Sequence, residues 1–516
     1  ASATAFHGLS TDQTFPTSTL RNGIASQNTM NAMYGAMFWL TTFLPNAAAY
    51  QVTPNTNTDT TPTATRVAGP NTPLAQSPLA HVNAAGTKVL SPTNDLVNAR
   101  LTFENGFVAN ITASRVSPDP GRRFRTFSEE GFVEIDLRGR INADAIVVHQ
   151  SARDLAIVGE VPSATGFRRA RLGAEGTVGE QVNWVAEFDF ARGTISFKDV
   201  YVGVDRLPLL CRVRLGHMLE PFSLEGYTSS NFITFMERSS VNALSPGRNW
   251  GAGVFAFSED ERVVFQIGAF RPGTGSNGDD IGNGNDIAFT TRLTGLPWLS
   301  ADGRSFVHLG AAFSQRRPPN DLVTINLGPQ NTLLTVEDTP GSPFQPVITI
   351  PASAQQLYNL QGALVLGPLS LQAEWTATDI DQIGGPTVFL NGGYAFVSYF
   401  LTGESRAYLR QDGKFGMTRV LEPFVCLRDG INHVRGPGAW EVAARFGYVN
   451  FSSGAIPRNA NGLRVGDTET TLTLGLNWYL NDYTRLMFNY THAIPVDPNF
   501  GPSFADSYGL RVAIFW

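Results

Sequence analysis

The chain has 516 residues, enough for one large domain or for several ordinary ones. Charged residues make up only 16% of it, against about 25% in a soluble domain, and the net charge of −6 gives no basic footprint for nucleic acid. The sequence contains no run of about 18 apolar residues, which excludes a helical membrane protein, and its two cysteines lack the spacing of a disulfide framework or a zinc site.

The first part of the chain differs from the rest. Residues 1–92 show no sustained periodicity, and Pro, Thr, Asn and Ala dominate 51–78, which predicts a loop or an extended linker. Two short strands are predicted at 96–103 and 107–113, and the Asn105-Gly106 pair between them favours a hairpin turn. We expect residues 1–132 to form a separate N-terminal segment that contains this hairpin.

From residue 133 onward, apolar and polar residues alternate over long stretches. Val133 and Ile135 lie on one face of the first stretch, and Glu134 and Asp136 lie on the other. This two-residue period is that of a β-strand with different surroundings on its two faces. The alternation continues for about 15 residues, longer than an ordinary strand but suited to a tilted strand that crosses a membrane.

The same pattern recurs to the end of the chain. It predicts sixteen strands, near 133–148, 166–178, 182–191, 196–205, 210–218, 250–257, 262–270, 286–295, 304–314, 357–366, 369–377, 393–402, 438–450, 468–480, 483–493 and 507–516. The loops after odd-numbered strands are often long and the turns after even-numbered strands are mostly short, as in outer-membrane barrels. The exception is 403–437, which could fold back into the lumen. The predicted fold class is all-β, with a sixteen-stranded antiparallel transmembrane β-barrel over residues 133–516.

The last strand ends the chain on an aromatic residue. Tyr508, Leu510 and Val512 alternate with smaller or polar residues, and the chain stops at Trp516. A terminal strand of this kind is typical of the closing strand of an outer-membrane barrel, where aromatic residues lie at the membrane interfaces. This segment alone leaves open a second interpretation, the last strand of a soluble sandwich.

Several stretches of the predicted barrel match one family in the same order. They include Phe167-Arg168-Arg169-Ala170-Arg171-Leu172, Lys198-Asp199-Val200-Tyr201-Val202-Gly203, Glu220-Pro221-Phe222-Ser223-Leu224-Glu225 and Gly475-Leu476-Asn477-Trp478. Through them, residues 133–516 resemble the phosphate-selective porin O and P family.

This resemblance implies a homotrimeric porin embedded in the lipid of a Gram-negative outer membrane. It implies passive diffusion of small hydrophilic solutes and ions through a water-filled pore, with a preference for anions such as phosphate as a further hypothesis. The alternative is a structural or surface-display protein anchored by a barrel with a plugged lumen. Neither interpretation predicts an enzyme.

A second resemblance covers residues 77–137. Residues 94–101 and 103–110 look like part of the C-terminal sheet domain of Gfo/Idh/MocA-type oxidoreductases. The nucleotide-binding half of that family has no counterpart here, since no glycine-rich loop lies between a strand and a helix. We therefore carry over no catalytic residue and predict no cofactor.

The predicted pore lining mixes basic and acidic residues, and such linings set the selectivity of a pore together with its radius. Strict alternation turns several basic residues inward, and among them are the candidates Arg169, Arg171, Arg212 and Arg214. Cross-strand ion pairs that hold the wall and a basic track for anions are both open interpretations. In the related family, paired arginines approach the constriction. The resemblance therefore implies Arg168 and Arg169, although strict alternation turns only one of them inward.

The third long loop, predicted over 219–249, carries the charged candidates Glu237, Arg238 and Arg248. In porins the third loop folds inward and narrows the pore. Opposed charges on it would set up a transverse field across the pore. Alternatively, Glu237 and Arg238 would pin the loop to the wall, and the sequence leaves both interpretations open.

One acidic loop is a weak candidate for binding a metal ion. Asp279, Asp280 and Asp286 lie close together in sequence, and carboxylate oxygens are the ligands that Ca²⁺ prefers. A solvated loop that binds nothing is the competing interpretation.

Overall fold

The computed structural model describes residues 131–516 apart from 159, 194, 209–210, 274, 276–277, 279–285, 327–346, 425–435, 454–467 and 498–500, and the backbones of six strands before residue 131. The chain divides into two compact units, one of residues 1–131 with 428–432 and one of residues 132–427 with 433–516. Within the described residues, none of the helices has the length and apolar character needed to cross a membrane.

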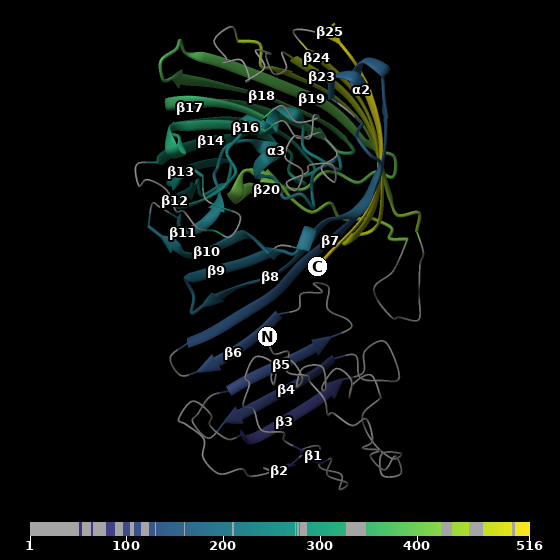
Figure 1. Cartoon of the computed structure of the whole chain (residues 1–516). Helices are drawn as coiled ribbons and strands as arrows, with labels where there is room; N and C mark the ends of the chain where they lie inside the picture. Colours follow the sequence, from purple (N-terminus) through teal and green to yellow (C-terminus); the bar gives the residue numbers. More distant parts are fainter. Residues whose placement is uncertain are drawn as a thin grey trace, which may run out of the picture. The chain divides into compact units, whose positions relative to one another are not determined.

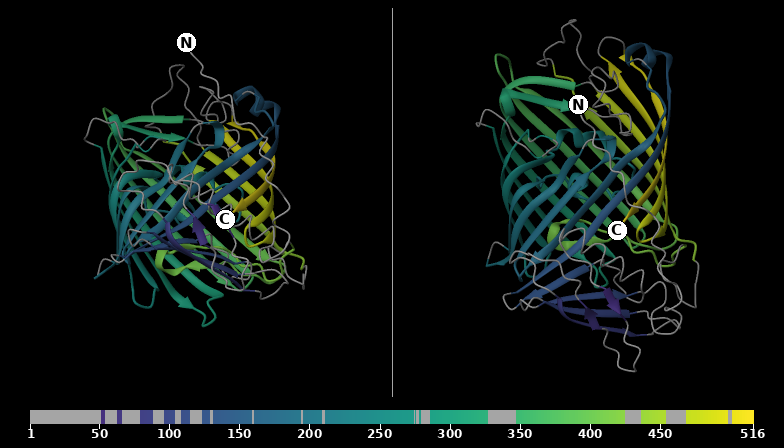
Figure 2. Two further views of the ribbon diagram at one scale, coloured as in Figure 1. Left: turned by 90° about the horizontal axis from the view of Figure 1, so that it is seen from below. Right: turned by 60° about the horizontal axis from the view of Figure 1, so that its bottom comes forward.

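The larger unit is a closed barrel of sixteen antiparallel strands, in which neighbours along the chain pair and the last strand pairs with the first (Figures 1 and 2). The strands are β7 (Gly131–Gln150), β8 (Ala164–Val178), β9 (Val182–Asp189), β10 (Ser196–Leu207), β11 (Cys211–Leu219), β12 (Arg248–Phe257), β13 (Val263–Arg271), β14 (Ile287–Leu299), β15 (Ser305–Arg317), β17 (Val347–Leu366), β18 (Leu369–Gln382), β19 (Val388–Phe400), β22 (Ala439–Asn450), β23 (Thr468–Asn481), β24 (Thr484–Asp497) and β26 (Ala505–Phe515). Each of them corresponds to a predicted strand, so the predicted fold class is confirmed.

The C-terminal strand closes the barrel, as its sequence predicts. β26 pairs antiparallel with β7, from Ala505 opposite Gln150 to Phe515 opposite Arg140. The backbones of Trp516 and Gly139 extend the ladder, with N–H···O distances of 3.0 and 3.1 Å. A Cβ atom on Gly139 would lie 2.3 Å from Cζ2 of the Trp516 ring, so the close approach of that ring requires a glycine.

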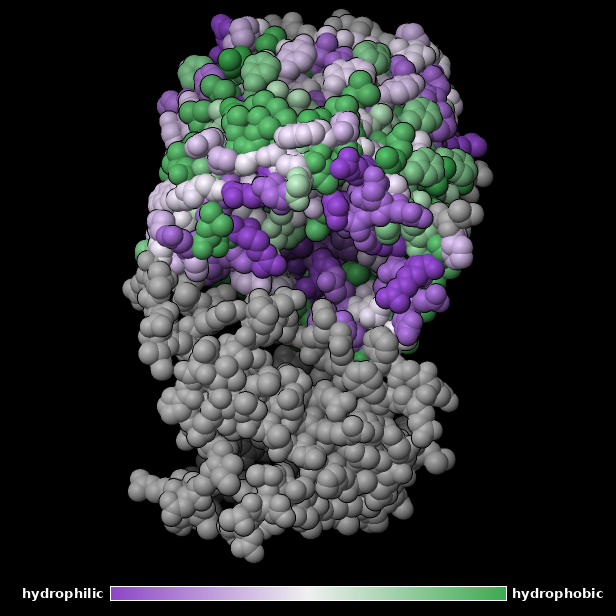
Figure 3. Space-filling model, turned by 180° about the vertical axis from the view of Figure 1, so that it is seen from behind, coloured by the Kyte–Doolittle hydropathy of each residue, from purple (hydrophilic) through white to green (hydrophobic). Residues whose placement is uncertain are grey.

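Side chains alternate between the outer and inner faces of the wall. On β23, Leu472 and Leu474 are exposed, whereas Thr471 and Thr473 are buried. Hydrophobic side chains cover large areas of the outer wall, while hydrophilic ones gather in the lower part of the described surface (Figure 3). An apolar outer band around a polar interior is what a lipid bilayer requires of a barrel.

One strand that was not predicted, β16, extends the wall beside β17. We expected a loop over 315–356, but β16 (Leu322–Asn326) pairs with the first residues of β17, from Leu322 opposite Pro351 to Asn326 opposite Val347. The reason is a short alternation in each segment, in which Ile325 and Ile350 are buried together. Pro351 interrupts this alternation, and a long connection separates the two segments, so the alternation was not recognised in the sequence.

The N-terminal unit contains strands but only their backbones are described. β3 (Leu79–Thr87), β4 (Leu96–Phe103), β5 (Val108–Ser114) and β6 (Arg123–Ser128) pair antiparallel in that order. β4 and β5 occupy the two stretches predicted as strands, whereas β3 and β6 were not predicted. The short β1 (Gln51–Thr53) and β2 (Thr63–Thr65) pair with each other within the predicted linker.

Candidate functional site: the third loop and its arginine wall

The loop between β11 and β12, residues 220–247, lies inside the barrel and is called the third loop below. Its short helix α3 (Leu224–Tyr227) is visible inside the ring of strands (Figure 1). The wall holds the loop backbone through polar side chains. The Arg485 guanidinium donates to the carbonyl of Ile233 at 2.9 Å, and the backbone N–H of Met236 donates to Asn489 Oδ1 at 2.8 Å.

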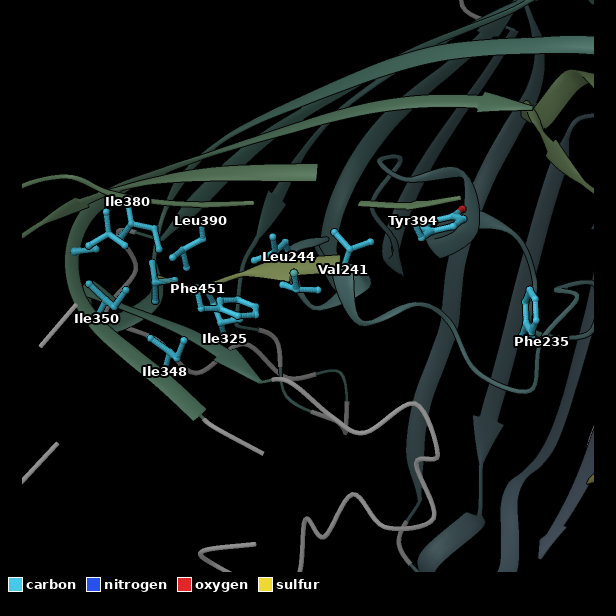
Figure 4. Close-up of a cluster of buried hydrophobic side chains, with 14 of the residues drawn as sticks. Phe235, Val241, Leu244, Ile325, Ile348, Ile350, Ile380, Leu390, Tyr394 and Phe451 are labelled. Atoms are coloured by element: carbon cyan, nitrogen blue, oxygen red, sulfur yellow. The ribbon is translucent and has the colours of Figure 1, made fainter. Parts of the chain in front are cut away.

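Apolar side chains of the third loop pack against the part of the wall formed by β16 to β19. Phe235, Val241 and Leu244 pack with isoleucines and leucines of β16 to β19 in one buried cluster (Figure 4). Val241 and Leu244 lie on a 3₁₀ turn, Ser240–Leu244. Because apolar burial is the main driving force for packing, this cluster fixes the loop inside the lumen.

A buried carboxylate of the wall holds the start of α3. Glu374 on β18 accepts hydrogen bonds from the backbone N–H groups of Leu224 at 2.8 Å and Glu225 at 2.6 Å, and from the Tyr394 hydroxyl at 2.6 Å. The helix-terminal N–H groups are thereby satisfied in the lumen. Glu225 in turn pairs with Arg445 of β22 at 3.0 Å.

Glu237 of the third loop meets three arginines of the wall. Arg168 donates to it through Nε at 3.0 Å and Nη2 at 3.3 Å, Arg169 through Nη2 at 3.2 Å, and Arg511 through Nη2 at 2.6 Å. Burial alone raises the pKa of Glu237, but these guanidinium groups hold that pKa well below its ordinary value. The carboxylate is therefore ionised at neutral pH and pins the loop to the wall.

A β-bulge brings both Arg168 and Arg169 to Glu237. In the pairing of β7 with β8, Asn142 lies opposite Arg169 and Ala143 lies opposite Phe167, so Arg168 is an extra residue in β8. A bulge releases its residue from strict alternation and re-aims the side chain. Strict alternation predicted only one inward arginine here, and the register shift is the reason that both reach the loop.

The remaining predicted candidates lie in the lumen but in separate contacts. Arg171 pairs with Glu187 at 2.9 Å and Asp189 at 2.7 Å, which are cross-strand ion pairs of the kind that one of the two open interpretations described. Arg248 pairs with Asp199 at 2.8 Å.

Arg238 forms its hydrogen bonds within the third loop. It donates to the carbonyl oxygens of Glu225, Gly226 and Thr228 at 2.8 to 3.1 Å, so it stabilises the third loop internally.

Arg212 and Arg214 lie nearer the short-turn end of β11, beside a second segment in the lumen. Arg212 pairs with Asp412 at 3.0 Å, and the Arg214 guanidinium stacks on Tyr201 and Phe255. Asp412 belongs to the connection between β19 and β22. This is the one connection on the short-turn side that was predicted to be long.

That connection does fold into the barrel, and its described residues 401–424 are called the inserted segment below. It carries the two-residue strands β20 (Tyr408–Leu409) and β21 (Lys414–Phe415). Phe415 is 1% exposed and packs with Leu224 of the third loop. Arg292 of β14 donates to the Gly413 carbonyl at 2.6 Å. The third loop and the inserted segment thus enter from opposite ends and meet.

The described residues do not form the calcium site that was considered for Asp279, Asp280 and Asp286. Asp286 is buried and pairs with Arg271 at 3.2 Å, while Asp279 and Asp280 lie outside the described residues. No group of three or more His, Cys, Asp or Glu side chains suited to a metal ion occurs in the part of the chain that the structure describes.

Sequence reasoning missed several inward residues. Arg292 and Arg316 occupy inward positions of β14 and β15, so alternation could have found them. Glu220 lies in the third loop, where no periodicity exists, yet it pairs with Arg316 at 2.7 Å and accepts from the Asn249 amide at 2.6 Å. Only the folded position of the loop reveals that contact.

Comparisons with known proteins find a matching family and several similar proteins. The family described as phosphate-selective porin O and P matches residues 135–494. Porin O of Pseudomonas aeruginosa is 25% identical over 363 residues, which cover 65% of this chain and 78% of that protein. Among solved structures, the barrel is similar to OmpT of Vibrio cholerae, with a TM-score of 0.44 and 10% identity over 74% of this chain and 98% of that chain.

The second resemblance also has a counterpart. A UDP-N-acetylglucosamine 3-dehydrogenase of Acidithiobacillus ferrooxidans is 33% identical over 87 residues, which cover 17% of this chain and 25% of that enzyme. So short a match transfers no activity. The porin match covers more than half of the chain and coincides with the closed barrel. The chain therefore belongs to the phosphate-selective porin O and P family and is an outer-membrane porin of the Gram-negative type.

Proposed function

We propose that this porin conducts small anions in preference to cations, with phosphate as a preferred solute. The description of its family supports the proposal. The observation that carries it is the contact of the third loop with the wall, where three guanidinium groups face two carboxylates. These are Arg168, Arg169 and Arg511 on one side and Glu237 and Asp144 on the other. The cluster keeps one excess positive charge, because arginine stays protonated.

A second cluster with more cations than carboxylates lies toward the end of the barrel that carries the short turns. Arg212, Arg214 and Lys414 gather there with Asp205 and Asp412. Burial alone would raise the pKa of Asp412, but the positive groups Lys414, Arg214 and Arg212 lower that pKa to about 2, so Asp412 is ionised. Lining charge of one sign focuses ions of the opposite sign in a narrow, partly dry passage.

The test is ion selectivity in planar bilayers. In a KCl gradient the reversal potential is expected to have the sign of anion permeation, and added phosphate is expected to block the chloride current by occupying the same groups. A reversal potential of zero or of the cation sign would contradict the anion preference and leave a general diffusion porin.

We also propose that the barrel acts as a homotrimer and that residues 1–132 form a separate unit without catalytic activity. Family membership supports the trimer, and the division of the chain near residue 131 supports the separate unit. A chain that lacks residues 1–130 should insert into membranes, give the mass of three barrels by light scattering in detergent, and conduct like the full chain. Loss of conductance on truncation, or a monomer mass, would contradict these statements.

A further inference from the structure

The middle of the inserted segment, residues 407–416, forms a small hairpin that is called the lumen hairpin below. Its strand β20 is visible inside the ring of wall strands (Figure 1). β20 pairs with β21, and the N–H of Gly416 donates to the carbonyl of Ala407 at 2.9 Å. The N–H of Gly413 donates to the carbonyl of Leu409, also at 2.9 Å. Because these backbone bonds lie within the hairpin, it can move relative to the wall without breaking them.

Ion pairs hold the lumen hairpin in the barrel, and water reaches them. Arg410 pairs with Glu261 of the turn between β12 and β13 at 2.7 Å, and the two side chains are 46% and 24% exposed. Asp412 pairs with Arg212 of β11 at 3.0 Å and with Lys414 of the hairpin itself at 3.3 Å, with exposed fractions of 18% to 23%. Since ion pairs in contact with water contribute little free energy, these contacts form a latch that can open.

The third loop is held more firmly than the lumen hairpin. Its pairs Glu220–Arg316 and Glu225–Arg445 are at most 6% exposed, and breaking a buried pair leaves an uncompensated charge. The third loop also has the larger apolar anchor, the cluster that it shares with β16 to β19, whereas the buried anchor of the hairpin is Phe415 in a smaller cluster. Of the two segments in the lumen, the hairpin is therefore the one that yields first.

Two glycines provide a hinge and a close contact for this movement. Gly403 lies where the chain leaves β19 for the lumen, with a φ of 93° and no heavy atom within 4 Å of an ideal Cβ, so large changes of φ and ψ meet no obstacle there. Gly413 lies at the tip, where its carbonyl accepts from Arg292 at 2.6 Å. A Cβ atom on Gly413 would lie 2.5 Å from Oγ1 of Thr294, so the docked tip leaves no room for a side chain.

We propose that the lumen hairpin is a displaceable gate between the third loop and the short-turn end of the pore. In its docked position the hairpin narrows the pore. When the latch at Asp412 and Glu261 opens, the hairpin swings about Gly403 toward the short-turn end, and the pore widens for larger solutes. The third loop stays in place as the fixed constriction. This inference goes beyond the anion preference and requires only that the barrel conducts.

Single-channel currents of the full-length chain test the gate. Wild type is expected to alternate between two conductance levels, and a variant that lacks residues 407–416 is expected to stay at the larger of the two. Heat-modifiable migration in gels establishes that each variant is folded.

Gly413→Ala is the variant that pushes the docked tip from the wall without a change of charge. Its share of time at the larger level should rise about tenfold, as for an overpacked contact that undocking relieves. Gly179→Ala is the matched control, because Gly179 has the same φ of 64° in the turn between β8 and β9 but no heavy atom within 4 Å of an ideal Cβ. The control introduces the same backbone strain and should keep the wild-type share.

Asp412→Asn opens the latch by a different route. It removes the carboxylate that Arg212 and Lys414 share, so the share of the larger level should again rise, by about tenfold for two partly exposed ion pairs. Glu180→Gln is its control, because it removes one negative charge from an exposed turn at the same end of the barrel.

A hairpin that only fills space would give different currents. Wild type and both folded point variants would then show one level, with no transitions to the level of the deletion variant. That result would overturn the gate while conduction stands. Transitions that persist in the folded deletion variant would also overturn it. The absence of any current from inserted wild-type protein would overturn the open pore itself, and the gate with it.

Discussion

Replacement of Glu237 by glutamine is expected to increase the anion selectivity of the pore. The substitution removes the carboxylate that three guanidinium groups share, but keeps an oxygen that accepts hydrogen bonds from Arg168 and Arg511. A unit charge about 6 Å from the path of an ion contributes about 0.7 kcal/mol even at the dielectric constant of water. The anion-to-cation permeability ratio should therefore rise by at least about threefold, and more in a partly dry lumen.

Reversal potentials of Glu237→Gln in a KCl gradient measure this change. Glu259→Gln is the matched control, because Glu259 is an exposed residue of the turn between β12 and β13. Its substitution removes the same charge from a site outside the lumen. Equal reversal potentials for Glu237→Gln and wild type would show that the Glu237 cluster does not face the ion path.

Replacement of Arg511 by methionine is expected to destabilise the barrel strongly. Arg511 is 1% exposed on β26, and its Nε and Nη2 donate to the two oxygens of Asp144 on β7 at 2.7 and 2.6 Å. These two strands close the barrel, and Arg511 also reaches Glu237 and the Met236 carbonyl of the third loop. Removing one partner of a buried ion pair leaves an uncompensated charge, which typically costs about 3–5 kcal/mol.

Urea unfolding of the protein in lipid vesicles measures this loss of stability. The double variant Arg511→Met with Asp144→Asn should recover part of it, because the orphaned carboxylate is removed. If the single variant were as stable as wild type, the seam between β26 and β7 would not depend on this pair, and the role assigned to Arg511 would be wrong.

The barrel could be predicted from the sequence because a lipid-facing strand has a strict local signature. Leu472 and Leu474 alternate with Thr471 and Thr473, and the same period recurs in many strands of the wall. The alternation of long loops and short turns then indicates at which end of the barrel each strand begins. β16 was missed because its five residues give too short a period for this signature.

The candidate site was only partly predictable, since its essential features are relations between distant segments. The bulge at Arg168 is a mismatch between two strands and has no mark in either strand alone. Alternation marks Arg214 as inward, but the register that places Gly203 and Gly253 opposite it cannot be read from one strand alone. The burial of Glu220 and Glu237 depends on how the third loop packs, which no local pattern encodes.

We expect this barrel to be an open, water-filled pore although the third loop and the inserted segment meet inside it. The most direct test is the current through single molecules of the purified full-length chain in a planar bilayer bathed in KCl at neutral pH. An open pore is expected to give discrete steps whose size increases linearly with voltage. The absence of steps from folded, inserted protein would contradict it and would favour a barrel with a plugged lumen that anchors a surface or structural protein.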